Sequence, residues 1–86
     1  MLTGPLPATR KSRDRSGIKL EDIGAFEVNE AFASVIGAWE DEIKPNTDLV
    51  NVNGGAIALG HPLGCSGARV MTTLVHHMRD NNIRYG

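Results

Sequence analysis

The stretch from Asn51 to Arg69 reads NVNGGAIALGHPLGCSGAR, and it decides how this chain folds. The residues LVNVN at 49–53 overlap its start and are typical of a short strand, because apolar and polar side chains alternate. The segment 54–67 is rich in glycine, which permits left-handed backbone and the close approach of other groups. From Ala68 the apolar residues recur with the period of a helix. The stretch therefore predicts a strand, a glycine loop and a helix, in that order.

The ends and the inner face of this last helix can also be predicted. Ser66 is the expected N-cap, since serine favours that position, and the residues DNN at 80–82 are the expected end. The side chains expected to face inward are those of Val70, Met71, Leu74, Val75 and Met78.

Upstream of the stretch, the sequence predicts two helices with a strand between them. The charged stretch ATRKSRDRSG is predicted to form a helix that ends at Gly17. The residues AFEVN at 25–29 are predicted to form a short strand. A second helix begins at Glu30 with Asn29 as its N-cap, and it stops before Pro45. Its apolar face consists of Phe32, Val35, Ile36, Trp39 and Ile43.

The order of elements indicates an α/β fold in one domain, residues 1–86. Helix, strand, helix, strand, glycine loop and helix succeed one another, and IRYG at 83–86 reads as the entrance to a further strand. A chain of 86 residues buries only a modest core, so we expect a partner surface. Because the net charge is only −1, we do not expect a nucleic-acid partner. Because no apolar stretch is long enough to span a bilayer, we do not expect a membrane partner. The basic run at 10–15 is interpreted as a solvated helix face, and a single cysteine fits a reducing compartment.

His61 is the residue of the glycine loop that most invites a chemical role, because Gly60 and Pro62 constrain its backbone. The residues alone leave several interpretations open. The histidine can be an ordinary turn residue, it can pair with Cys65 in a small hydrolase site, or the loop can cradle phosphate. The loop matches neither common phosphate-binding motif. Metal binding is not expected, since the neighbouring side chains of His76 and His77 diverge on a helix. Cys65 can equally be a small packing residue.

Two motifs taken together resemble those of the thiolase family. NVNGGAIALGHPLGCSGAR is similar to the glycine-histidine signature of thiolases, and EVNEAFA at 27–33 is similar to their Asn-Glu-Ala-Phe motif. The order and separation of the two motifs fit that family, and the likeness extends over nearly the whole chain. The resemblance implies part of the C-terminal half of a layered αβαβα fold, incomplete in these residues.

The resemblance also implies an activity, namely acyl transfer between acyl-CoA or acetyl-CoA and coenzyme A. His61 matches the histidine that activates a nucleophilic cysteine and helps to bind the thioester oxygen. Asn29 matches the asparagine that positions a water in an oxyanion hole. Ala31 and Phe32 match residues that line the pantetheine channel, although Phe32 can equally be a core residue. No tightly bound cofactor is implied, because coenzyme A and its thioesters are substrates.

The resemblance implies that both catalytic cysteines of a thiolase lie outside these 86 residues, and that Cys65 matches neither. The chain alone is therefore expected to be inactive, with the N-terminal thiolase domain as a partner and a dimer or tetramer as the intact assembly. The expected location is the bacterial cytoplasm, or the mitochondrial or peroxisomal matrix in a eukaryote. Two other interpretations are a non-catalytic assembly module and a relative of the β-ketoacyl synthases, although an Asn-x-His-Gly-Thr type motif is missing where NEAFA stands.

Overall fold

Two extended segments form the middle of the molecule. The computed structural model describes residues 2–86, and in it Phe26 and Val50 form a parallel β-bridge. The Phe26 N–H donates to the carbonyl of Leu49 at 2.9 Å, and the Asn51 N–H donates to the Phe26 carbonyl at 2.8 Å. The segments predicted as strands at 25–29 and 49–53 therefore do lie side by side, but their pairing is limited to this bridge.

The pairing ends where the backbone of the second segment turns away. A short 3₁₀ helix, η2 (Thr47–Leu49), occupies its start, and Asn51 has a left-handed φ of 48°. The Asn51 side chain then replaces the backbone ladder, because its Oδ1 accepts the Val28 N–H at 2.9 Å and its Nδ2 donates to the Val28 carbonyl at 3.0 Å. This corrects the prediction of two regular strands.

The first two long helices pack on one another through a buried tryptophan. Helix α1 (Pro5–Ser16) ends at the predicted cap, Gly17, which has a φ of 69°. Helix α2 (Ala33–Ile43) buries Val35, Trp39 and Ile43. The Trp39 ring is only 1% exposed, and its Nε1–H donates to Thr9 Oγ1 of α1 at 2.8 Å. Phe26 meets the Trp39 ring edge-on at 5.7 Å, which ties both helices to the extended segments.

The start of α2 differs from the prediction. The helix begins at Ala33 rather than Glu30, and its N-cap is Phe32 in an extended conformation. Asn29 therefore is not a helix cap, and the segment before the helix remains extended. Phe32 also lies outside the core, since 61% of it is exposed.

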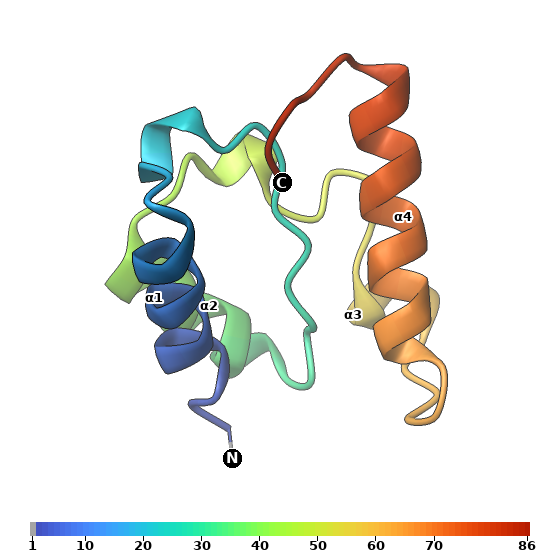
Figure 1. The fold of residues 1–86 in the computed structure, drawn as a ribbon. Helices are drawn as coiled ribbons and strands as arrows, with labels where there is room; N and C mark the ends of the chain where they lie inside the picture. Colours follow the sequence, from blue (N-terminus) through green and yellow to red (C-terminus); the bar gives the residue numbers. More distant parts are fainter. Residues whose placement is uncertain (1) are drawn as a thin grey trace.

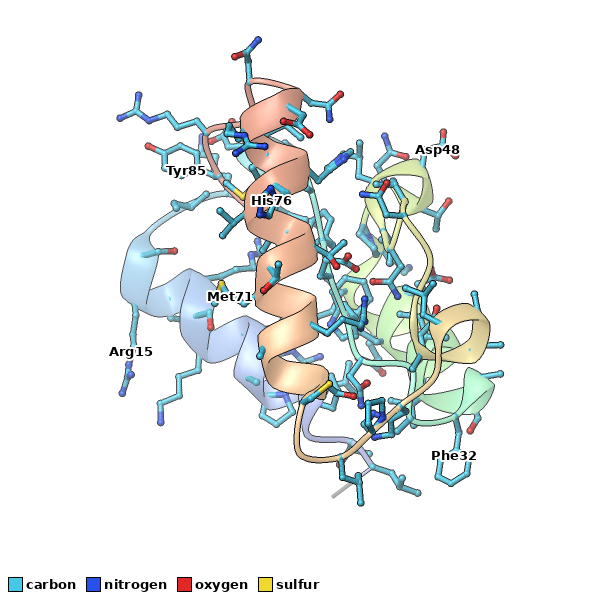
Figure 2. All side chains as sticks on the ribbon, turned by 90° about the vertical axis from the view of Figure 1, so that its right-hand side faces the viewer. Arg15, Phe32, Asp48, Met71, His76 and Tyr85 are labelled. Atoms are coloured by element: carbon cyan, nitrogen blue, oxygen red, sulfur yellow. The ribbon has the colours of Figure 1, made fainter. Side chains whose placement is uncertain are left out.

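The glycine-rich segment contains a short helix and leads into the longest one. Helix α3 (Ala56–Leu59) interrupts the predicted loop, and α4 (Ser66–Asp80) begins two residues earlier than predicted. Ser66 is the first residue of α4, and the N-cap is Cys65. The N-cap therefore lies one residue before the predicted one. Met71 and Val75 are exposed rather than inward, and Figure 2 shows His76 on the face of α4 turned to the viewer.

The helices lie in layers on both sides of the extended segments. Figure 1 shows α1 and α2 on one side and α4 on the other, with the extended chain between them. A further short helix, η1 (Leu20–Asp22), connects α1 to the first extended segment. The Tyr85 carbonyl accepts the Gly24 N–H at 2.9 Å, so the last residues also join the middle layer. Within residues 2–86, no helix has the length and apolar character needed to cross a membrane.

Candidate active site

The four residues singled out by the sequence line one cavity. Asn29, Ala31 and Phe32 come from the segment before α2, and His61 comes from the loop before α4. The cavity has a volume of about 420 Å³. Its other lining residues are Leu2, Pro5, Val35 and Leu63. The fold thus brings the two sequence motifs together at one predominantly apolar hollow.

Asn29 supplies a polar acceptor among the residues that line this cavity. Its Oδ1 is buried and has no hydrogen-bond partner among residues 2–86. A buried carbonyl oxygen without a partner is costly, since it loses its hydration without a replacement. This oxygen is therefore available to a water or a ligand that enters the cavity.

The rim of the cavity is apolar and accessible. Phe32 is 61% exposed and Leu63 is 86% exposed, and Figure 2 shows the Phe32 ring projecting outward from the molecule. Ala31 lies beside Phe32 and is also exposed. Exposed apolar side chains around a hollow are typical of a binding surface.

Glu30 forms hydrogen bonds that connect the two motifs whose residues line this cavity. Its Oε2 accepts from Asn51 Nδ2 at 3.1 Å, and its Oε1 accepts from the Ile57 N–H at 3.1 Å. The carboxylate lies against the backbone at Gly55, where an added Cβ would overlap it. Glu30 therefore ties the segment that carries Asn29 to the segment that leads to His61.

The loop that carries His61 is closed on itself by hydrogen bonds. The Pro62 carbonyl accepts the N–H groups of Cys65 and Ser66, each at 3.0 Å. His61 Nδ1 lies 2.6 Å from Ser66 Oγ, and Ser66 Oγ also donates to the Pro62 carbonyl at 3.1 Å. Among residues 2–86, no hydrogen bond joins Cys65 to His61, and Cys65 is exposed. The geometry therefore gives no support to a Cys65–His61 pair.

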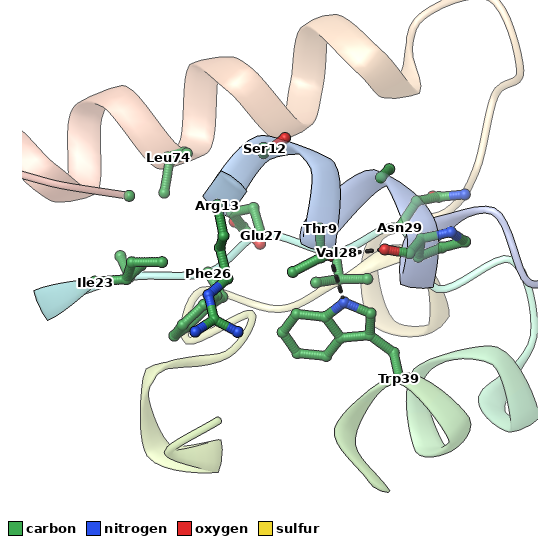
Figure 3. Close-up of a pocket in the computed structure, with 14 residues that line it drawn as sticks. Thr9, Ser12, Arg13, Ile23, Phe26, Glu27, Val28, Asn29, Trp39 and Leu74 are labelled. Atoms are coloured by element: carbon green, nitrogen blue, oxygen red, sulfur yellow. Dashed lines mark hydrogen bonds between the residues drawn. The ribbon is translucent and has the colours of Figure 1, made fainter. Parts of the chain in front are cut away.

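A second cavity, of about 380 Å³, lies between α1, the first extended segment and α4. Figure 3 shows Trp39 donating to Thr9 at its edge and Leu74 of α4 above it, and Asn29 borders both cavities. Glu27 lines this cavity, and burial raises the pKa of its carboxyl above the ordinary 4.5, while Arg69 and His77 oppose part of the rise. The Arg69 guanidinium is buried without a hydrogen-bond partner among residues 2–86.

The sequence alone missed two residues that shape the site. Glu30 was expected only as the first residue of a helix, and Ser66 only as a helix cap. Both residues lie inside the two motifs, which could have indicated a role in the site. Their hydrogen-bond partners can be identified only from the structure. No group of three or more metal-binding side chains lies together in the described part of the chain.

Comparison with known proteins places this arrangement in a family. The family model for the C-terminal domain of thiolases matches residues 1–86. A steroid 3-ketoacyl-CoA thiolase of Mycobacterium tuberculosis is 54% identical over 86 residues, which are 100% of this chain and 21% of that protein. An acetyl-CoA acetyltransferase of Shinella zoogloeoides is 48% identical, over 100% of this chain and 22% of that protein. The chain therefore spans about a fifth of the length of these relatives.

Solved structures agree with the sequence comparison. The crystal structure of human mitochondrial 3-ketoacyl-CoA thiolase matches with a TM-score of 0.93 and 44% identity, covering 96% of this chain and 21% of that one. The Bacillus anthracis acetyl-CoA acetyltransferase matches with a TM-score of 0.92 and 41% identity, covering 95% and 21%. The expected fold, part of the C-terminal half of a thiolase, is confirmed. The chain belongs to the thiolase C-terminal domain family.

Proposed function

We propose that this chain forms one wall of a thiolase active site that transfers acyl groups between coenzyme A thioesters. The observation that supports it best is that His61, Asn29, Ala31 and Phe32, which come from two separate motifs, line a single cavity. The reaction is either the condensation of two thioesters or the thiolytic cleavage of a 3-ketoacyl-CoA.

His61 is proposed as the base that activates the nucleophilic cysteine. A thiol has an ordinary pKa near 8.5, so a neighbouring imidazole that takes its proton increases the reactive thiolate at neutral pH. The S–H bond of the cysteine breaks and an N–H bond forms on the imidazole. That new N–H can then donate to the oxygen of the thioester.

Asn29 is proposed to hold a water that stabilises negative charge on the reacting oxygen. Its buried Oδ1 can accept a hydrogen bond from such a water, whose other hydrogen then points at the oxygen. Phe32 and Ala31 provide an apolar wall for the pantetheine arm of the substrate. Coenzyme A and its thioesters are bound as substrates, and no tightly held cofactor is required.

The catalytic cysteines and the rest of the coenzyme A site come from the remainder of the thiolase in this proposal. These 86 residues by themselves are expected to show no turnover of acetoacetyl-CoA. The intact enzyme is expected to be a dimer or tetramer.

The proposal can be tested by exchanging the segment. In a chimera, these 86 residues replace the matching segment of the Shinella zoogloeoides enzyme, and thiolysis of acetoacetyl-CoA is measured. The expected result is turnover by the chimera and none by the 86 residues alone. Asn29→Ala should lower kcat/KM of the chimera by about 100-fold, whereas Asn53→Ala, on an exposed residue outside the cavity, should leave it unchanged. A correctly folded chimera without turnover would refute the proposed function.

A further inference from the structure

The hydroxyl of Ser66 lies between the His61 ring and the backbone of the same loop. Ser66 is only 6% exposed and is the first residue of α4. Its Oγ lies 2.6 Å from His61 Nδ1 and 3.1 Å from the Pro62 carbonyl oxygen. Both contacts arise from a side chain held by a helix and by a closed loop, so the hydroxyl has little freedom to move away.

The chemistry of the three groups favours one placement of the protons. A carbonyl oxygen can only accept, and a serine hydroxyl has one hydrogen to donate. If this hydrogen pointed at Nδ1, the lone pairs of Ser66 Oγ and the Pro62 oxygen would face one another at 3.1 Å without a hydrogen between them. If it points at the Pro62 oxygen, Oγ can accept a hydrogen from Nδ1, and both contacts are favourable.

We propose that Ser66 is a positioning residue that holds neutral His61 as the Nδ1–H tautomer and so leaves Nε2 as the free base. What Nε2 then does rests on the proposed function, but the tautomer follows from the loop alone. Among residues 2–86, Nε2 has no hydrogen-bond partner, and the ring is exposed at the cavity that Asn29 and Phe32 also line.

This arrangement lets one ring carry out two successive tasks without turning over. Nε2 first takes the proton of the cysteine thiol, as the S–H bond breaks and the N–H bond forms. The imidazolium then keeps its Nδ1–H on Ser66, while the new Nε2–H donates to the thioester oxygen. Without the serine, the ring could rotate, or adopt the other tautomer, in which Nε2 already carries a hydrogen and cannot act as a base.

The tautomer can be read directly by nitrogen NMR. The chimera is labelled with ¹⁵N-histidine, and long-range proton–nitrogen correlations of His61 are recorded at a pH where the ring is neutral. A His61→Gln sample assigns the signals by their loss. The expected result is a protonated-type shift for Nδ1 and a bare-type shift for Nε2. The reverse pattern, with the proton on Nε2, would overturn the proposal.

Substitutions at position 66 separate orientation from folding. Ser66→Ala should lower kcat by about tenfold to a hundredfold, the scale at which outer partners of metal-binding histidines act, and should abolish the preference for the Nδ1–H tautomer. Ser66→Thr keeps a hydroxyl and should restore both. Ser34→Ala, on an exposed serine of α2 outside the cavity, should change neither.

These outcomes distinguish this proposal from the proposed function. A Ser66→Ala variant with an unchanged rate and an unchanged tautomer would refute the role of Ser66 while leaving thiolase activity intact. If the chimera has no turnover, the NMR pattern of the unsubstituted protein still decides the tautomer. If the Ser66 variants do not fold, that same pattern again gives the answer.

Discussion

At the scale of single residues, the site depends on a few side chains that meet across the two motifs. Glu30 bridges Asn51 and the Ile57 N–H, and it fits because residue 55 has no side chain. The sequence predicted His61, Asn29, Ala31 and Phe32 as site residues through family resemblance, and the structure places all four at one cavity. The predicted caps Asn29 and Ser66 were wrong, because cap propensity is local whereas the fold sets the residue at which each helix begins.

Because Glu30 packs against Gly55, alanine substitutions at Gly55 and at Gly37 should change the free energy of unfolding in opposite directions. Gly55→Ala should lower the free energy of unfolding by about 1–3 kcal/mol, because the new methyl overlaps the Glu30 carboxylate. Gly37→Ala should raise it by about 1 kcal/mol, since Gly37 lies in α2 with open space around it and alanine favours helices. Urea unfolding of both variants, followed by circular dichroism, gives the comparison. Equal effects at the two positions would contradict the account of Glu30.

The buried carboxyl of Glu27 predicts a pH dependence of stability. Burial raises its pKa in the folded state, so its contribution to stability is complete below the unfolded pKa near 4.5 and is lost as the pH rises through the folded pKa. Glu27→Gln removes this loss. The free energy of unfolding of the variant, relative to that of the parent, should therefore increase as the pH rises from 4.5. Unfolding free energies measured between pH 4 and pH 8 test this, and a relative value that falls with pH would contradict it.

At the scale of elements, helices were predicted better than strands. The helical period located α2 and α4 within a few residues, because that period reflects the face each helix buries. The two predicted strands became one bridge, because Asn51 adopts a left-handed φ and its side chain takes over the pairing with Val28. Alternation of apolar residues cannot show where the backbone turns away.

The hydrogen bond between Trp39 of α2 and Thr9 of α1 predicts how much the free energy of unfolding falls when the Thr9 hydroxyl is removed. Thr9→Val keeps the shape of the side chain but leaves the Trp39 N–H, in a residue only 1% exposed, without its acceptor. An unpaired buried donor costs about 1–3 kcal/mol, so the free energy of unfolding should fall by that amount. Thr72→Val, on the exposed face of α4, is the matched control and should change it by less than about 0.5 kcal/mol. Similar stabilities for the two variants would show that the hydrogen bond does not hold α1 to α2.

At the scale of the whole molecule, the layered arrangement explains why two distant motifs share a cavity. The extended segments lie between α1 and α2 on one side and α4 on the other (Figure 1). Residues 29–32 and the loop that carries His61 line the same cavity. An α/β fold could be predicted from the alternation of elements. The cavity itself, the exposure of Phe32 and the burial of Asn29 Oδ1 without a partner among residues 2–86 could not be predicted, because they depend on how the layers pack.

The catalytic role proposed for His61 can be tested with one substitution in the chimera. His61→Ala should lower kcat/KM for acetoacetyl-CoA thiolysis by about 10²–10⁴-fold, the range that a positioned general base contributes. His76→Ala, on the exposed face of α4, should leave kcat/KM within twofold of the parent value. If the His61→Ala chimera kept the parent rate, this loop would not supply the catalytic base.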